Sequence, residues 1–593
     1  MSLSKPALAA SIETQLSDAV QSRDWAHATA LAEKLPATAN DASWQVAAEA
    51  HLQLQDWAGA ANALAQVRQI DEPLTMRLKL CRNMALLKEK RPNIFSVLAG
   101  VTPSNTFRIQ NTSAGLKTLA YTSDKGTTQL LSSTPNPADS VQKTMEQLLP
   151  SMKQGKSIAM LGLGDGYMFD AVVRQAPTLL LGRRPAVYLL EPNVDQLFAC
   201  LMLHDFTGAD GPIAADFVMW HIGPKWCGEL SAAMKREPFL PFPHVTVRQG
   251  LSSAIVEQAF PKLLTEIQER DAALDDVIDS YYSSLPADHF RMIFGHNPPR
   301  VPRALLVTTR YSTVLQYSTR DAAEALRELG WDVRVGIESA NHHLLTRTGL
   351  RSLIADHKPD LILQIDHNRA EYDDLYPSVI PFVNWIQDLL PNLMTPEVGR
   401  RIGRRDFVLA PSLQRWVDEY AYPPSQCLEF RKLTRLPVRP RSWTSSDDQV
   451  VYVSNWSQTP HRIKDELTSG KTGQDRDVLA RACDRMIEIY ANGNCLPSAG
   501  DCRRVLEEVM REMSLAASEA AVRQAAMQLF DRMNNLLYRH QGLRWAAEAC
   551  HAAGMKLQIF GSGWDRHPEF WRFAKGKIDY GPDLEALTRT ACV

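Results

Sequence analysis

The chain has 593 residues, of which 45% are hydrophobic and 22% are charged. This composition is typical of soluble globular proteins, and the length allows three or four domains. The formal net charge of −2 excludes a chain-wide electrostatic attraction to nucleic acid or to anionic membranes. No apolar run is long enough to span a bilayer, and the cysteines form no CxxC pair. We therefore expect a cytoplasmic protein with reduced thiols and without a membrane span.

Residues 1–100 are predicted to be helical, with a weak internal repeat. Trp25 and Trp57 are 32 positions apart, and two alanines follow each of them at the same offsets. The pattern resembles a tetratricopeptide array, whose period is about 34 residues. A plain helical bundle is the alternative. A tetratricopeptide-like region implies a docking surface for a protein partner.

Residues 101–298 are predicted to form a Rossmann-like domain. The segment SIAML is a strand, and Gly162, Gly164 and Gly166 follow it before a helix. Glycines allow a sharp turn and a close approach to a ligand, while the helix N-terminus supplies backbone N–H groups. The next strand ends at Glu191, 25 residues beyond Gly166. An acid there can accept hydrogen bonds from ribose hydroxyls.

This spacing fits a methyltransferase-like topology, with S-adenosylmethionine as the ligand, better than a dinucleotide site. The alternative is a tight turn without a ligand. The segments LLSSTPNPADSVQKTM, AMLGLGDGYMFDAVV, VYLLEPNVDQLFACLMLHDF and FVMWHIGP resemble the Rossmann region of motility accessory factor proteins. Those proteins modify flagellin with sialic-acid-like sugars. The resemblance implies a glycosylation context, with flagellin or another surface protein as an acceptor.

Residues 299–440 are predicted to form a second α/β domain, and residues 449–593 a third one with a helical insertion. Asp366 and His367 follow the strand DLILQI, and Asp388 follows the strand FVNWI. Carboxylates and a histidine at strand ends are the groups that base catalysis on an acceptor hydroxyl needs. Each of the two aspartates has helix capping as its alternative role. Two further strand ends, at Asn455 and at Gly561-Ser562-Gly563-Trp564, offer small polar loops suited to a diphosphate.

Four segments in this order, PFVNWIQD, VVYVSNWS, LQIFGSGW and YGPDLEAL, resemble GT-B glycosyltransferases of the spore-maturation-protein type. The resemblance implies transfer of a sugar from a nucleotide sugar to a protein or glycan acceptor. No metal bound by a DxD motif is implied. Asp388, or Asp366 with His367, would be the acceptor-side base. Asn455, Gly561 to Trp564 and Asp583 would border the donor.

The chain departs from that family because it ends ten residues after Asp583. We therefore expect an incomplete second GT-B domain, in a fragment of a longer protein or in a decayed enzyme. The predicted fold is a multidomain α/β protein with a helical repeat-like start, a Rossmann-like domain and a GT-B pair. Glycosyl transfer is the predicted function. An S-adenosylmethionine-dependent methyltransferase and a non-catalytic scaffold are the alternatives. His342-His343 is predicted to lie in a solvated turn, because no third ligand for a metal has matching spacing.

Overall fold

The structure is a computed structural model that describes residues 5–104, 106–132, 134–312, 314–388, 390–411, 413–431 and 448–590. It divides into two compact units, residues 1–434 and 435–593. The predicted boundary at residues 440–447 lies outside the described residues. Within the described parts of the chain, no helix is both long and apolar enough to cross a membrane.

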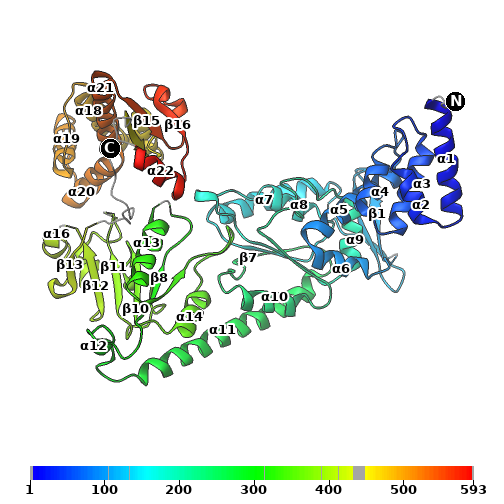
Figure 1. Ribbon diagram of the computed structural model, residues 1–593, viewed down its shortest axis with the longest axis horizontal. Helices are drawn as coiled ribbons and strands as arrows, with labels where there is room; N and C mark the ends of the chain where they lie inside the picture. The colour runs from blue at the N-terminus through cyan, green and yellow to red at the C-terminus, as the bar shows by residue number, and fades with distance from the viewer. Residues whose placement is uncertain are drawn as a thin grey trace. The chain divides into compact units, whose positions relative to one another are not determined.

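The chain begins with six helices, of which each of the first four packs against the next (Figure 1). They are α1 (Lys5–Gln21), α2 (Trp25–Ala32), α3 (Asp41–Gln53), α4 (Trp57–Leu64), α5 (Glu72–Lys90) and α6 (Pro92–Ala99). The repeated Asp-Trp pair starts α2 and α4 in the same way. Asp24 accepts the backbone N–H of His27, and Asp56 accepts that of Gly59. The repeat in the sequence is therefore a repeated helix N-cap.

A small antiparallel sheet follows, made of β1 (Phe107–Asn111), β2 (Lys117–Thr122) and β3 (Thr128–Leu130). Next comes a parallel sheet with the order β6-β5-β4-β7. Its strands are β4 (Ile158–Leu161), β5 (Val187–Glu191), β6 (Val218–Ile222) and β7 (Val245–Arg248). The chain adds β5 and then β6 on one side of β4, and it then crosses back to add β7 on the other side of β4. The carboxyl ends of β4 and β7 flank the switch point, where α/β sheets usually bind ligands.

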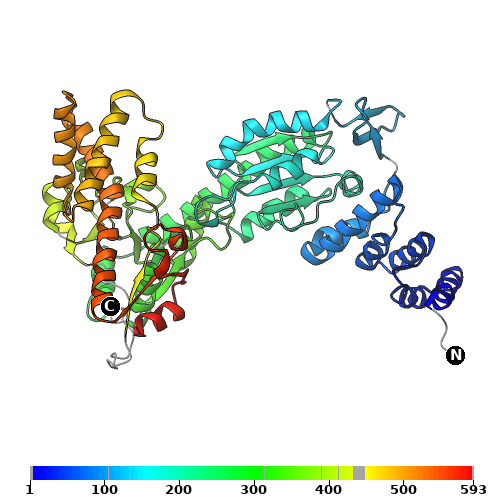
Figure 2. The same ribbon diagram turned by 90° about the horizontal axis from the view of Figure 1, so that it is seen from above.

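Helices cover both faces of this sheet (Figure 2). On one face lie α7 (Pro137–Lys153), α8 (Tyr167–Arg174) and α9 (Val194–Leu203), and on the other lie α10 (Trp226–Arg236) and α11 (Ser253–Ser283). The first half of α11 packs on this sheet through Val256 and Leu263. Its last turns pack on the next sheet through Ile278 and Tyr282. One helix therefore ties the two sheets together.

The second parallel sheet has six strands in the order β13-β12-β11-β10-β8-β9. They are β8 (Arg303–Val307), β9 (Asp332–Gly336), β10 (Leu361–Ile365), β11 (Phe382–Trp385), β12 (Asp406–Ala410) and β13 (Cys427–Glu429). The helices around it are α12 (His289–Ile293), α13 (Leu315–Glu328), α14 (Arg347–His357), α15 (Pro396–Arg400) and α16 (Leu413–Asp418). The switch point of this sheet lies between β8 and β10.

The prediction of a solvated turn at His342-His343 is wrong for His343, whose side chain is 2% exposed. The turn packs against the first parallel sheet's loops instead. His343 Nε2 lies 3.3 Å from a carboxylate oxygen of Glu237, and the backbone N–H of Leu344 donates to the carbonyl of Phe239. Burial lowers the pKa of His343. The histidine therefore belongs to a contact between the two sheet domains.

The second unit contains a three-stranded parallel sheet and a helical bundle (Figure 2). The strands are β14 (Gln449–Val453), β15 (Lys556–Phe560) and β16 (Ala574–Gly576). The helices are α17 (Pro460–Thr468), α18 (Gly473–Ala491), α19 (Ala499–Glu512), α20 (Glu519–Gln528), α21 (Asn535–Ala552) and α22 (Pro582–Thr590), with a π-helical segment at Leu529–Asn534. The predicted mixed α/β architecture with parallel sheets is thus confirmed.

Candidate functional site

The carboxyl edge of the six-stranded sheet gathers the two polar segments predicted for this domain, with the loop after β8 beside them. The loops after β8, β10 and β11 meet there because these strands are neighbours and run in parallel. Asp366 and His367 follow β10, while Gln387 and Asp388 follow β11. The structure therefore brings the predicted catalytic residues to one edge of one sheet, beside its switch point.

Asp366 joins two of these loops. Its side chain is fully buried, and its Oδ1 accepts the backbone N–H groups of Gln387 at 2.6 Å and Asp388 at 3.0 Å. Its φ of 60° is in the left-handed region, which aspartate tolerates better than most residues. Asp366 therefore holds the loop after β11 against the loop after β10 through these two hydrogen bonds.

Asp388 is an exposed carboxylate at this edge. Its backbone position is set by the hydrogen bond to Asp366. His367 is partly exposed, and its Nδ1 lies 3.0 Å from a carboxylate oxygen of Glu371. Of the three predicted catalytic residues, Asp366 is buried and His367 is partly exposed, whereas Asp388 is exposed and its backbone N–H is held by Asp366.

Glu338 at this edge was not singled out by the sequence, whereas Gln387 directly precedes the predicted Asp388. Glu338 follows β9 and is buried, and its carboxylate accepts the Thr309 hydroxyl at 2.9 Å and the Arg310 backbone N–H at 3.0 Å. Gln387 is buried as well, and its Nε2 finds no hydrogen-bond acceptor among the described residues. The signal for Glu338 was an acid two residues after the end of a partly exposed strand, which is weaker than the signal for Asp366, an acid directly after a buried strand.

In the second unit, the turn Gly561–Trp564 packs against the loop after β14. The backbone N–H of Ser562 binds Asn455 Oδ1 at 2.8 Å, and the Trp564 indole donates to the carbonyl of Ser454 at 2.6 Å. A Cβ at Gly561 would lie 1.9 Å from that same carbonyl oxygen, and the φ of Gly561 is 138°. Only glycine fits at this position.

The structure gives the remaining predicted donor residues different surroundings. Trp564 is fully buried and packs among His540, His567 and Phe570. Its ring therefore belongs to the core of this unit. Asp583 lies in the first turn of α22 and is exposed.

The glycine loop of the first parallel sheet packs against its own chain. Gly162, Gly164 and Gly166 all have positive φ values, of 88°, 61° and 91°. A Cβ at Gly162 would lie 2.2 Å from the carbonyl oxygen of Gln249, and one at Gly166 would lie 2.7 Å from the ring of His204. The close approach that these glycines allow is therefore to neighbouring loops of the protein.

Glu191 is buried beneath this loop. Its side chain accepts the backbone N–H of Leu163 at 2.7 Å, that of Asn193 at 2.8 Å and the Ser252 hydroxyl at 2.6 Å. Burial raises the pKa of Glu191, while these three hydrogen bonds act in the opposite direction. The predicted ribose acceptor is fully buried and holds three segments of its own domain together.

Within the described part of the chain, no cluster of three or more His, Cys, Asp or Glu side chains is arranged to hold a metal ion. Comparison with protein families, with curated proteins and with solved structures found no match for this chain.

Proposed function

We propose that this chain is a glycosyltransferase that moves a sugar from a nucleotide sugar to a protein or glycan acceptor in the cytoplasm. The observation that carries the proposal is Asp388. It is an exposed carboxylate at the carboxyl edge of a parallel sheet, on a loop that the buried Asp366 holds in place. Open α/β sheets bind ligands at this edge, near the switch point.

In this proposal Asp388 is the general base. The acceptor hydroxyl transfers its proton to the carboxylate as its oxygen forms a bond to the anomeric carbon of the sugar. The bond between that carbon and the phosphate oxygen breaks, and the nucleotide leaves with the electron pair, as a diphosphate from a UDP-, GDP- or dTDP-sugar and as CMP from a CMP-sugar. A positioned base of this kind contributes about 10²- to 10⁴-fold to a rate.

The other parts of the chain take supporting roles. We assign the sheet β8–β13 to the acceptor half of a GT-B pair and the sheet β14–β16 to the donor half. In the donor half, the turn Gly561–Gly563 and Asn455 border the diphosphate of the nucleotide sugar. The helices α1–α4, with their repeated N-caps, are assigned to a tetratricopeptide-like surface that binds a protein partner.

The test is nucleotide release by the full chain from a panel of UDP-, GDP-, dTDP- and CMP-sugars, with and without EDTA. We expect release from one donor class, and we expect it to persist in EDTA. Asp388→Asn should lower the turnover by about 10²-fold or more, because the amide cannot accept the proton. Asp356→Asn is the matched control, since Asp356 is an exposed aspartate near the end of α14, which leads into the opposite edge of the same sheet.

The outcomes separate the alternatives. Donor-specific release that Asp388→Asn abolishes and Asp356→Asn leaves intact supports the proposal. Release that is equal in both variants contradicts the assignment of the base to Asp388. The absence of binding and turnover with every nucleotide sugar would refute glycosyl transfer and favour a scaffold. A larger residue in place of Gly561, such as tryptophan, cannot be used to block the predicted donor site. Its side chain would collide with the Ser454 backbone, so a loss of activity could come from misfolding.

A further inference from the structure

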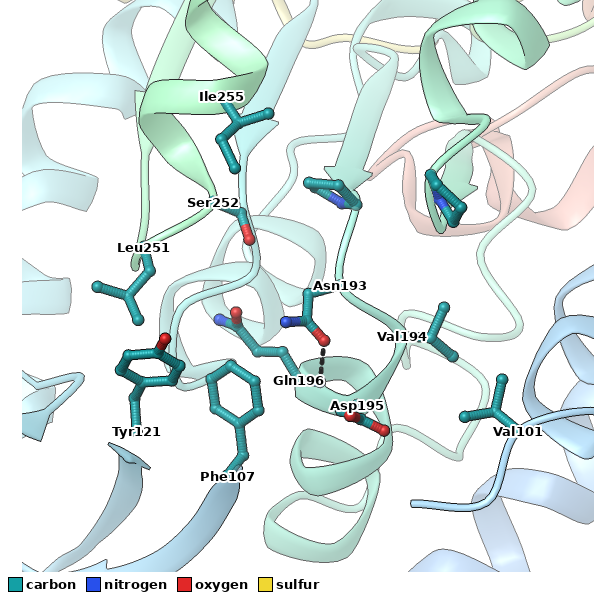
Figure 3. Close-up of a pocket in the computed structure, with 12 residues that line it drawn as sticks. Val101, Phe107, Tyr121, Asn193, Val194, Asp195, Gln196, Leu251, Ser252 and Ile255 are labelled. Atoms are coloured by element: carbon teal, nitrogen blue, oxygen red, sulfur yellow. Dashed lines mark hydrogen bonds between the residues drawn. The ribbon is translucent and has the colours of Figure 1, made fainter. Parts of the chain in front are cut away.

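The first parallel sheet carries a pocket that the glycine loop does not line. It lies past the carboxyl ends of β5 and β6, between the β1–β2 hairpin and the segment that starts α11 (Figure 3). Its volume is about 490 Å³. Small-molecule sites commonly measure about 300–1,000 Å³, so the pocket can hold a molecule of nucleoside size.

Aromatic and aliphatic side chains form its walls. Phe107 and Tyr121 are paired across the hairpin, with their ring centroids 5.5 Å apart. Figure 3 shows these two rings below Leu251 and Ile255. Leu251 is 39% exposed and Ile255 is 62% exposed. Exposed apolar side chains that gather around one hollow favour a flat, apolar ligand group there.

Gln196 gives the pocket a polar contact. Its side chain is fully buried, and its Nε2 donates to the carbonyl of Gly164 at 2.7 Å. That carbonyl can only accept, so the orientation of the amide is fixed. The Oε1 then receives no hydrogen bond from any described residue. A buried acceptor of this kind is stabilised by a ligand N–H or O–H group.

The charge around the pocket disfavours phosphate. Asp195 is the charged side chain among the residues that line it. The nearby glycine loop offers little help, because its N–H groups at Leu163 and Gly166 already bind Glu191 and a backbone carbonyl. Among the side chains that line the pocket, an anionic ligand would therefore meet the Asp195 carboxylate and no cationic group, while a neutral or cationic ligand meets no such penalty.

We propose that this pocket binds a nucleoside that carries no phosphate. Its base lies against Phe107 and Tyr121, and one of its N–H or O–H groups donates to Gln196 Oε1. The site is separate from the sugar-transfer residues and stands whether or not glycosyl transfer is correct.

Calorimetric titration of the full chain tests the proposal. The probes are adenosine, guanosine, cytidine, uridine and S-adenosylmethionine, and the 5′-diphosphate of each nucleoside. We expect one nucleoside or S-adenosylmethionine to bind, and the corresponding diphosphate to bind at least tenfold more weakly at this site. Leu251→Glu places a charge on the apolar wall and should weaken nucleoside binding at least tenfold. Leu264→Glu is the matched control, because Leu264 is a similarly exposed leucine, 41% against 39%, on α11 outside the pocket.

Each result decides between the possibilities. Nucleoside binding that Leu251→Glu weakens and Leu264→Glu preserves supports the site. A diphosphate that binds as tightly as its nucleoside, with both lost in Leu251→Glu, overturns the charge argument and the proposal with it. Binding that survives Leu251→Glu places the ligand elsewhere and also overturns it, as does the absence of heat with every probe. Nucleotide release from a nucleotide sugar, measured as for the proposed function, should be unchanged in Leu251→Glu, so the two proposals can fail separately.

Discussion

The substitution Glu191→Gln tests whether this buried acid is a structural bracket or a ligand contact. The carboxylate accepts three hydrogen bonds, from the backbone N–H groups of Leu163 and Asn193 and from the Ser252 hydroxyl. A glutamine has one oxygen and one NH₂ group in the same space. Its oxygen can keep the two bonds that Oε1 makes, and its NH₂ group then faces the N–H of Leu163.

The magnitude follows from that mismatch. A buried backbone donor loses its acceptor, which costs about 1–3 kcal/mol, and the two retained bonds lose their charge-assisted strength. We therefore expect a loss of ~3 kcal/mol in the stability of the first parallel-sheet domain. For a domain of this size, that lowers the melting temperature by about 6–12 °C.

Calorimetry of the full chain measures the shift, and hydrogen exchange of the amides in residues 158–166 and 187–193 localises it. Glu257→Gln is the control, because Glu257 is 45% exposed and its pairing with Arg248 is at the surface. Exposed pairs contribute about 0–1 kcal/mol. If Glu191→Gln melts as the control does, and its amides exchange at the wild-type rate, the structural role of the three hydrogen bonds to Glu191 is contradicted. Ribose binding by Glu191 then stays a prediction to be tested.

Three further predictions concern the hydrogen bonds of Asp366, the tight turn at Gly561 and the pH dependence of stability through His204. Asp366→Ala should destabilise its domain by about 2–4 kcal/mol in urea unfolding, because the backbone N–H groups of Gln387 and Asp388 lose their acceptor. Asp366→Asn keeps an acceptor oxygen and should cost less than half as much. Equal losses in the two variants would contradict the structural role of the Asp366 carboxylate. Gly561→Ala should lower the melting temperature of the second unit by forcing a Cβ against a carbonyl oxygen, whereas Gly542→Ala, inside α21 with nothing within 4 Å of its Cβ, should raise stability by about 0.5–1 kcal/mol. Burial lowers the pKa of His204 from 6.5 to about 4, so the unfolded chain binds more protons in that range and stability falls as the pH drops from 6.5 towards 4, by up to about 1.4 kcal/mol per pH unit. His204→Gln keeps an N–H donor for the Asp165 carbonyl. It should make the melting temperature depend less steeply on pH between 4 and 6.5, by the contribution of one titrating group. An unchanged slope would contradict the lowered pKa of His204.

The strands and the residues that end them were predictable from local patterns. Buried apolar runs such as LILQI and FVNWI identified β10 and β11, and the polar residues after them had to lie at a carboxyl edge once the strands were parallel. The Asp-Trp repeat also had a local cause, because Asp24 and Asp56 cap the helices that follow them. These predictions succeed because a period, a cap or a turn involves residues only a few positions apart.

The roles of the buried acids were not predictable in the same way. Glu191 has the sequence position of a ribose acceptor, yet Ser252, 61 residues later, and Leu163, 28 residues earlier, occupy its oxygens. Asp366 has the position of a base, yet it binds backbone groups 21 and 22 residues further along. No local pattern records which distant N–H group will reach a carboxylate.

The sequence by itself determined the kinds of elements, their order and the placement of polar residues at strand ends, because these depend on short-range periodicity and on turn chemistry. Tertiary structure alone decided which of those residues are exposed. It buried Trp564 in a core, left Asp388 at an open edge, and brought the hairpin residues Phe107 and Tyr121 to Leu251 to make a pocket. Exposure and cavities depend on which segments pack together, and that packing is decided by hydrophobic burial summed over the whole domain.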